Sequence, residues 1–206
     1  MEPSEPELVF RARSLASAGR RVLGITGPPG AGKSTLAARI VAALGPDTAR
    51  LVGMDAFHYA QAELARLGRT DRKGAPDTFD ADGYVALLER LRTSADPVVY
   101  AAEFRREIEE PIANAVPVPR EVTLVVTEGN YLLVDAGPWA RVRPLLDECW
   151  YVAAGDDPAR VERLIARHVA FGRSPEAARE WVLRSDERNA ALIAGTRDRA
   201  DLVVRW

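Results

Sequence analysis

Gly27-Pro28-Pro29-Gly30-Ala31-Gly32-Lys33-Ser34-Thr35 is the stretch of sequence that decides the fold. Its spacing matches G-x-x-x-x-G-K-S/T, the phosphate-binding loop. An apolar run at 22–26 precedes it and predicts a buried strand, and a helical pattern at 36–44 follows it. Strand, glycine-rich turn and helix start form the context that this motif requires. A plain Gly-Pro turn before an amphipathic helix is the weaker alternative, because the motif is complete.

The residues of this loop have separate physical roles. Glycines let backbone N–H groups converge on phosphate oxygens, and the new helix points its positive end at the same anion. We expect Lys33 to place a charge at the β- and γ-phosphates and Ser34 to offer a hydroxyl to Mg²⁺. The residues predicted to bind the nucleotide are Gly27, Pro28, Pro29, Gly30, Ala31, Gly32, Lys33, Ser34, Thr35 and, from a later helix, Arg163.

Composition excludes several classes of protein. With 206 residues, 47% hydrophobic and 28% charged, the chain is expected to form one globular domain over 1–206. Its net charge of −2 argues against nucleic acid as a partner. Cys149 is the one cysteine of the sequence, so an intramolecular disulfide is impossible, which fits a reducing compartment.

Hydropathy gives no sign of a membrane segment. No apolar run approaches the length of a span, and the acidic start at 1–5 is unlike a signal peptide. We therefore expect no membrane partner and a cytoplasmic location.

Apolar patterns along the chain predict alternating strands and helices. Strands are expected at 21–26, 50–54, 98–100, 122–127, 148–153 and 201–204, and helices at 6–19, 33–44, 60–67, 84–92, 138–146, 158–171 and 174–192. This order predicts a three-layer α/β fold, with a mostly parallel sheet of about five strands and helices on both faces. Residues 103–120, charged and then proline-rich, are expected to have little regular structure.

Two predicted strands end in carboxylates, Asp55 and Glu128. If those strands are neighbours, both groups face the γ-phosphate, because ligands bind at the carboxyl ends of such strands. Phosphoryl transfer needs one group to orient or deprotonate the acceptor hydroxyl and another to hold Mg²⁺. Each could instead be a cap or turn residue. No Asn-Lys-x-Asp stretch marks a switch GTPase, and no Asp-Glu pair marks a motor ATPase, so a small-molecule kinase fits better.

A later helix carries a row of basic residues. Arg160, Arg163 and Arg167 lie at i, i+3 and i+7 on one face, and His168 and Arg173 follow. Such a helix could be a lid that closes arginines over the transferring phosphate. A solvated helix face is the alternative, and for Arg160 it is equally favoured. His168 could contact the substrate or only a local network.

The sequence resembles the superfamily of phosphate-loop kinases that contains uridine kinase, phosphoribulokinase and bacterial pantothenate kinase. The resemblance rests on 27–35, 54–58, 72–80, 100–104, 127–133, 163–174 and 196–203. Within that superfamily, the chain is most similar to bacterial nucleoside/nucleotide kinase-like and fructose-transport kinase-like proteins. The resemblance implies ATP and Mg²⁺ as cofactors, a lid at about 158–190 and an acceptor-binding insertion at about 56–120. A homodimer is expected only by analogy with relatives.

The resemblance also implies roles for single residues. Asp55 would be the general base, and Ser34 and Glu128 would lie near Mg²⁺. The implied catalytic set is Asp55, Lys33, Glu128, Arg167 and Arg173. The implied acceptor-binding set is Asp55, His58, Arg72, Lys73, Asp80, Arg105, Arg106, Asn130, Tyr131 and His168. Asp80 is as well suited to a helix N-cap.

One departure concerns the acceptor. Where uridine and pantothenate kinases carry a Tyr-Ser-His-like stretch, this chain has Phe104-Arg105-Arg106. The arginines suggest an acidic acceptor or planar hydrogen-bond donors, unless they pair with neighbouring glutamates on the surface. The acceptor hydroxyl could belong to a nucleoside, a sugar or a pantothenate-like alcohol. The rival hypothesis is a nucleotide-binding regulator that has lost catalytic activity. The presence of both Asp55 and Glu128 argues against it.

Overall fold

The computed structural model describes residues 3–154 and 158–205. Its main sheet has the strand order β2-β5-β1-β6-β7, and every neighbouring pair is parallel. These strands are β1 (Arg21–Thr26), β2 (Ala49–Gly53), β5 (Leu124–Glu128), β6 (Glu148–Ala153) and β7 (Leu202–Arg205). The predicted parallel sheet of about five strands is confirmed.

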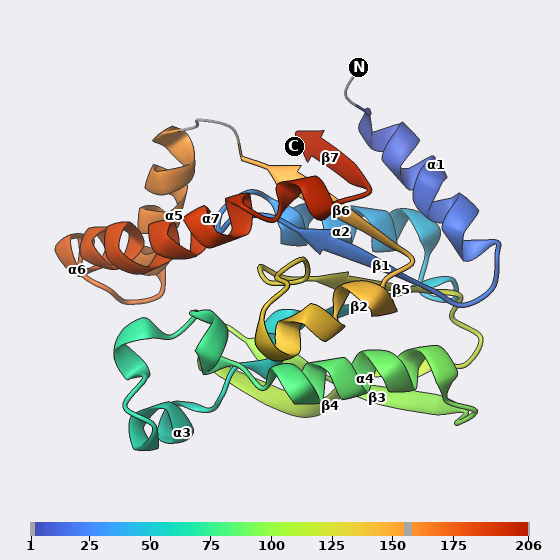
Figure 1. Ribbon diagram of the computed structural model, residues 1–206, viewed down its shortest axis with the longest axis horizontal. Coiled ribbons are helices and arrows are strands. Elements are labelled where there is room, and N and C mark those ends of the chain that lie inside the picture. Colours follow the sequence, from blue (N-terminus) through green and yellow to red (C-terminus); the bar gives the residue numbers. More distant parts are fainter. Residues whose placement is uncertain (1–2, 155–157, 206) are drawn as a thin grey trace.

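Helices lie on both faces of this sheet and at one end of it. The α-helices are α1 (Glu5–Ala16), α2 (Lys33–Leu44), α3 (Gln61–Arg66), α4 (Ala81–Thr93), α5 (Pro158–Ala170), α6 (Pro175–Trp181) and α7 (Glu187–Ala194). Figure 1 shows α1 and α2 on one face, α4 on the other, and α5, α6 and α7 gathered at one end of the molecule. The three-layer α/β fold is therefore confirmed.

The alternation of side chains along the strands explains the layers. Val22 and Cys149 point into the core beneath α4, whereas Leu23 and Trp150 point into the core beneath α1 and α2. All four side chains are completely buried. A strand covered on both faces must be apolar at both odd and even positions, which is why these strands are nearly continuous apolar runs.

The expectation of little regular structure at 103–120 is wrong. A two-stranded antiparallel hairpin occupies this region, formed by β3 (Val98–Arg105) and β4 (Glu110–Pro119). Val99 and Val118 are buried beneath it, and the intervening side chains face outward. The prolines of β4 suggested a loop, but β4 is an edge strand, where a missing N–H costs no ladder hydrogen bond.

Two other expectations differ in detail. In place of one helix at 138–146 there are two short 3₁₀ helices, Gly137–Arg141 and Arg143–Leu145. Pro144 has no N–H to give to the carbonyl four residues earlier, so an α-helix cannot continue through it. The helix expected at 174–192 is present as α6, a π-helical turn at Val182–Asp186, and α7.

Further short 3₁₀ helices connect these elements at Met54–Phe57, Thr70–Arg72, Pro76–Thr78 and Arg197–Arg199. Within 3–154 and 158–205, no helix has the length and apolar character needed to cross a membrane.

Candidate active site

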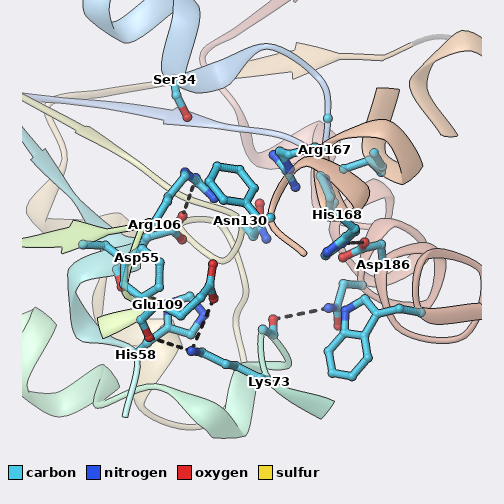
Figure 2. Close-up of a pocket in the computed structure, with 18 of the residues that line it drawn as sticks. Ser34, Asp55, His58, Lys73, Arg106, Glu109, Asn130, Arg167, His168 and Asp186 are labelled. Carbon is cyan, nitrogen blue, oxygen red and sulfur yellow. Dashed lines mark hydrogen bonds and ion pairs between the residues drawn. The ribbon is translucent and has the colours of Figure 1, made fainter. Parts of the chain in front are cut away.

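A cavity of about 740 Å³ opens where β1, β2 and β5 end. Its wall combines the loop after β1, the segment after β2, the turn between β3 and β4, and the helices α5 to α7. Figure 2 shows side chains from these segments pointing into one space. The sheet register brings Gly53 and Ile25 on either side of Glu128, so three strand ends meet at this edge.

The phosphate loop has the backbone geometry that its glycines predicted. Gly32 caps α2 with a φ of 92°, in the left-handed region that favours glycine. Gly27 has a φ of 146°, and a Cβ there would lie 2.3 Å from the carbonyl oxygen of Val152 on β6. The loop can therefore pack this closely against the sheet only without a side chain at position 27.

Lys33 lies at the first turn of α2, with only 8% of its surface exposed. Its ammonium donates to the carbonyl oxygen of Pro28 at 3.0 Å. Burial lowers the pKa of Lys33 to about 8, while the nearby carboxylates of Glu128 and Asp55 oppose this shift. A buried ammonium between a glycine-rich loop and two carboxylates is placed to meet a phosphate.

Asp55 and Glu128 come together because β2 and β5 are neighbours. Asp55 lies in the 3₁₀ helix after β2, and Glu128 is the buried last residue of β5. Burial raises the pKa of Glu128, and the charge of Asp55 raises it further, whereas Lys33 lowers it. Both carboxylates line the cavity, as the hypothesis of neighbouring strands required.

The donor set of the site suits a hard cation. The Ser34 hydroxyl and the Glu128 carboxylate both line the cavity, and Ser34 lowers the pKa of Glu128, so a hydroxyl and a carboxylate face the same space. Among the described residues, no group of three or more His, Cys, Asp or Glu side chains could hold a metal by itself. This pattern fits Mg²⁺, which takes one or two protein oxygens and completes its shell with phosphate oxygens and water.

An aromatic wall borders Asp55 on the side away from the loop. The ring of His58 contacts those of Phe79 and Phe104 in tilted arrangements, with centroids 3.9 and 5.0 Å away. His58 Nδ1 lies 2.8 Å from the carbonyl oxygen of Asp55, so Nδ1 carries the hydrogen and Nε2 is an acceptor. Burial lowers the pKa of His58, which keeps the ring neutral at pH 7.

The two adjacent arginines of the hairpin have different environments. Arg106 lines the cavity, and its Nη2 lies 3.3 Å from Oδ2 of Asp55. Arg105 is exposed and pairs with Glu103 at 2.7 Å on the outer surface. Arg105 therefore belongs to a surface ion pair, as one interpretation of this stretch held. Arg106 belongs to the site, as the other interpretation held.

The C-terminal helices close the cavity opposite the hairpin. Arg163 and Arg167 of α5 line it, and burial lowers the pKa of Arg167, as does the charge of Arg106. Arg173 stacks 3.9 Å above the ring of Trp181. His168 Nε2 lies 3.0 Å from Oδ2 of Asp186, so His168 both lines the cavity and belongs to a local network.

Arg160 is not on a solvated face. Only 8% of its surface is exposed. Its Nη1 donates to the carbonyl oxygen of Pro29 at 3.1 Å, and its Nη2 donates to Glu187 at 2.5 Å. Arg160 therefore ties α5 and α7 to the phosphate loop.

Some predicted residues lie outside the cavity lining. Arg72 pairs with Asp77, and Arg105 pairs with Glu103. Asp80 caps α4 by accepting from Gly83 N at 2.9 Å, the alternative that the sequence left open. Tyr131 is buried and its hydroxyl donates to the carbonyl oxygen of Gly74.

The remaining predicted acceptor residues line the cavity, and the roles of all of them stay predictions. These lining residues are Asp55, His58, Lys73, Arg106, Asn130 and His168.

Sequence reasoning missed two acidic residues of the wall, Glu109 and Asp186. Glu109 stood in the segment expected to be irregular, and Asp186 stood in a helix whose basic residues attracted attention. The turn between β3 and β4 could have been found from the alternation of Val99, Ala101 and then Val116, Val118, which predicts paired strands.

Comparison with known proteins agrees with this geometry. The model of the phosphoribulokinase/uridine kinase family matches residues 22–206. A provisionally named uridine kinase of Schizosaccharomyces pombe is 32% identical over 98% of this chain and 90% of its own length. A uridine kinase of Listeria monocytogenes is 27% identical over 89% of this chain and 85% of its own.

A solved structure is similar over its whole length. A provisionally assigned fructose transport system kinase from Silicibacter sp. TM1040 has a TM-score of 0.81 and 32% identity to this chain. The superposition covers 95% of this chain and 98% of the Silicibacter chain. The resemblance drawn from the sequence motifs is thus confirmed, and with it a nucleotide-binding kinase fold. The chain belongs to the phosphoribulokinase/uridine kinase family.

Proposed function

We propose that the protein transfers the γ-phosphoryl group of ATP to a hydroxyl of a small metabolite. The observation that carries this proposal is the meeting of Lys33, Asp55 and Glu128 in one cavity beside the phosphate loop. Donor binding and hydroxyl activation need these groups within reach of one another. Membership of a family of kinases supports the same reaction.

The work divides among the residues by position. The loop amides and Lys33 hold the β- and γ-phosphates of ATP. Asp55 accepts the hydrogen of the acceptor hydroxyl and orients its oxygen toward the γ-phosphorus. Ser34 and Glu128 hold Mg²⁺, which neutralises charge on the phosphate oxygens when it is bound.

The surrounding segments complete the site. We assign α5 to α7 as the lid, from which Arg163 and Arg167 stabilise charge on the transferring group. The insertion at about 56–120 supplies the acceptor side of the cavity, including His58 and Arg106.

The substitution Asp55→Asn tests this proposal. We expect the rate of ADP release with an active acceptor to fall 10²- to 10⁴-fold, about the contribution of a general base. Nucleotide affinity, measured by titration calorimetry, should stay within about twofold. Asp82→Asn is the matched control, because Asp82 pairs with Arg141 away from the cavity.

Two outcomes would contradict different parts of the proposal. Near-normal turnover by Asp55→Asn excludes Asp55 as the base. ATP binding by the native protein without transfer to nucleosides, sugars or pantothenate-like alcohols contradicts the kinase itself and favours a nucleotide-binding regulator.

A further inference from the structure

Glu109 is an acidic residue of the cavity that phosphoryl transfer does not require. It lies in the turn between β3 and β4 with a φ of 54°, in the left-handed region. Its side chain is 53% exposed, yet it lines the main cavity. The charge of Glu109 acts on His58 and Arg167, which lie on different walls. A carboxylate from an exposed turn thus lies at the part of the cavity lined by His58, Lys73, Phe104 and Arg106, which we call the acceptor half.

The direct partner of Glu109 is Lys73. The Lys73 ammonium lies 3.4 Å from Oε2 of Glu109 and donates to its backbone carbonyl oxygen at 2.8 Å. The Lys73 side chain is only 13% exposed, and its ammonium lies 5.5 Å from the centre of the Phe104 ring. An ammonium with so little exposure to water is stabilised by a nearby anion. In the described parts of the chain, the carboxylate that forms an ion pair with Lys73 is that of Glu109.

Arg106 repeats this arrangement beside the proposed base. It holds the Asp55 carboxylate at 3.3 Å, which is longer than a well-formed charged hydrogen bond. Figure 2 shows Lys73 and Glu109 pointing toward each other, with Arg106 and Asp55 joined on the same side of the cavity. Two cations of the acceptor half are therefore occupied by carboxylates of the protein itself.

We propose that the acceptor carries an acidic group, a carboxylate or a phosphate, which binds the Lys73 ammonium in place of the Glu109 carboxylate. This inference rests on the proposed function, because the acceptor hydroxyl must reach Asp55. The aromatic wall of Phe104 and His58 lies beside Lys73 and gives the acceptor carbons an apolar surface.

Matched ligand pairs test the acidic group directly. D-Gluconate is compared with D-glucose for a carboxylate, and D-fructose 6-phosphate with D-fructose for a phosphate. Binding is measured by calorimetry and by the shift in unfolding temperature, and transfer is measured by ADP release. We expect the acidic member of at least one pair to bind at least tenfold more tightly, and the pair that does so identifies the kind of acid.

Two substitutions should act in opposite directions. Glu109→Gln keeps the main-chain hydrogen bond from Lys73 and removes the competing charge, so affinity for the acid should rise about two- to fivefold. Lys73→Met should lower the affinity for the acidic ligand at least tenfold and leave the affinity for the neutral ligand unchanged. Glu107→Gln, in the same exposed turn, is the matched control and should change neither.

The results separate this inference from the proposed function. Equal or tighter binding of the neutral member in both pairs overturns the inference, as does failure of both acids to bind. Lower acid affinity in Glu109→Gln also overturns it, because it would make Glu109 a structural support. Absence of ADP release from every acceptor, with ATP bound, contradicts the kinase instead, and the binding experiments still decide on the acid.

Discussion

Replacing Glu128 with glutamine should change how the stability of the protein depends on pH. In the nucleotide-free protein, burial and the charge of Asp55 raise the pKa of Glu128 from 4.5 to about 7. The folded protein then binds this proton more tightly than the unfolded chain does. Raising the pH above about 4.5 therefore destabilises the folded state, and the loss is complete above about 7.

The size of the effect follows from the shift. Between pH 5 and pH 7, a group with these two pKa values lowers the free energy of unfolding by about 2 kcal/mol. Glutamine has no proton to lose, so Glu128→Gln should lack this contribution. The substitution also removes a charge that raises the pKa of Lys33, and the resulting fall in that pKa makes stability rise with pH. Both changes make the free energy of unfolding of Glu128→Gln fall less with rising pH than that of the native protein.

Urea unfolding at pH 5, 6 and 7, without nucleotide or divalent cation, measures the effect. From pH 5 to pH 7, the free energy of unfolding of the native protein should fall by about 2 kcal/mol more than that of Glu128→Gln. Glu121→Gln, at an exposed position, should follow the native protein. The contribution of His58, whose pKa is shifted by burial and by groups other than Glu128, is common to the variants and cancels in the comparison. Equal slopes for Glu128→Gln and the native protein would refute the claim that burial holds Glu128 protonated.

Two further predictions concern the supports of the site. Tyr84→Phe removes a buried 2.6 Å hydrogen bond to Thr127 Oγ1, next to Glu128, and should cost about 1 kcal/mol, or about 2–4 °C in unfolding temperature. Calorimetry that shows no loss would contradict a role for this bond. Arg160→Leu should cost about 2 kcal/mol and increase amide hydrogen exchange in α5, because it breaks the bonds to Pro29 and Glu187. Unchanged exchange in α5 would show that this link does not hold the helix.

The phosphate loop at 27–35, Asp55 and Glu128 form the part of the site that receives the nucleotide. Their positions could be predicted because they follow from local rules. The glycines of 27–35 require a particular backbone, and the parallel-strand rule places Asp55 and Glu128 at one edge. Neither conclusion depends on a distant contact beyond the pairing of neighbouring strands. Helical periodicity predicted a helix at 158–171, and Arg163 and Arg167, which it places on one face, both line the cavity.

The acceptor half could not be predicted in the same way, because its geometry depends on a hairpin. Arg105 is the last residue of β3 and is exposed, whereas Arg106 begins the turn and lines the cavity, so their environments diverge once β3 pairs with β4. The prolines of β4 hid that pairing. Glu109 could be placed only after the turn was known, since its contact with Lys73 joins residues 36 positions apart.

Main-chain carbonyls of the segment at 71–74 bind the C-terminal helical region. The carbonyl oxygen of Gly74 accepts from Tyr131 and from Asn189 of α7, and Arg184 donates to the carbonyl oxygen of Asp71 at 3.2 Å. These are main-chain acceptors, so none of these bonds depends on a side chain at 71 or 73, whereas position 74, with a φ of 97°, favours glycine. The segment that carries Lys73 can therefore change its side chains while its hold on the lid is kept.

Specificity and catalysis consequently rest on different parts of the molecule. Lys33 and Glu128 are buried at the sheet edge, where substitution disturbs the core as well as the chemistry. Lys73, Arg106 and Glu109 stand on a loop and a hairpin turn outside the main sheet. Under the proposed roles, a change of acceptor is expected in the second group, because surface segments tolerate substitution better than a close-packed core. Relatives with the same phosphate loop and different acceptors are the expected consequence.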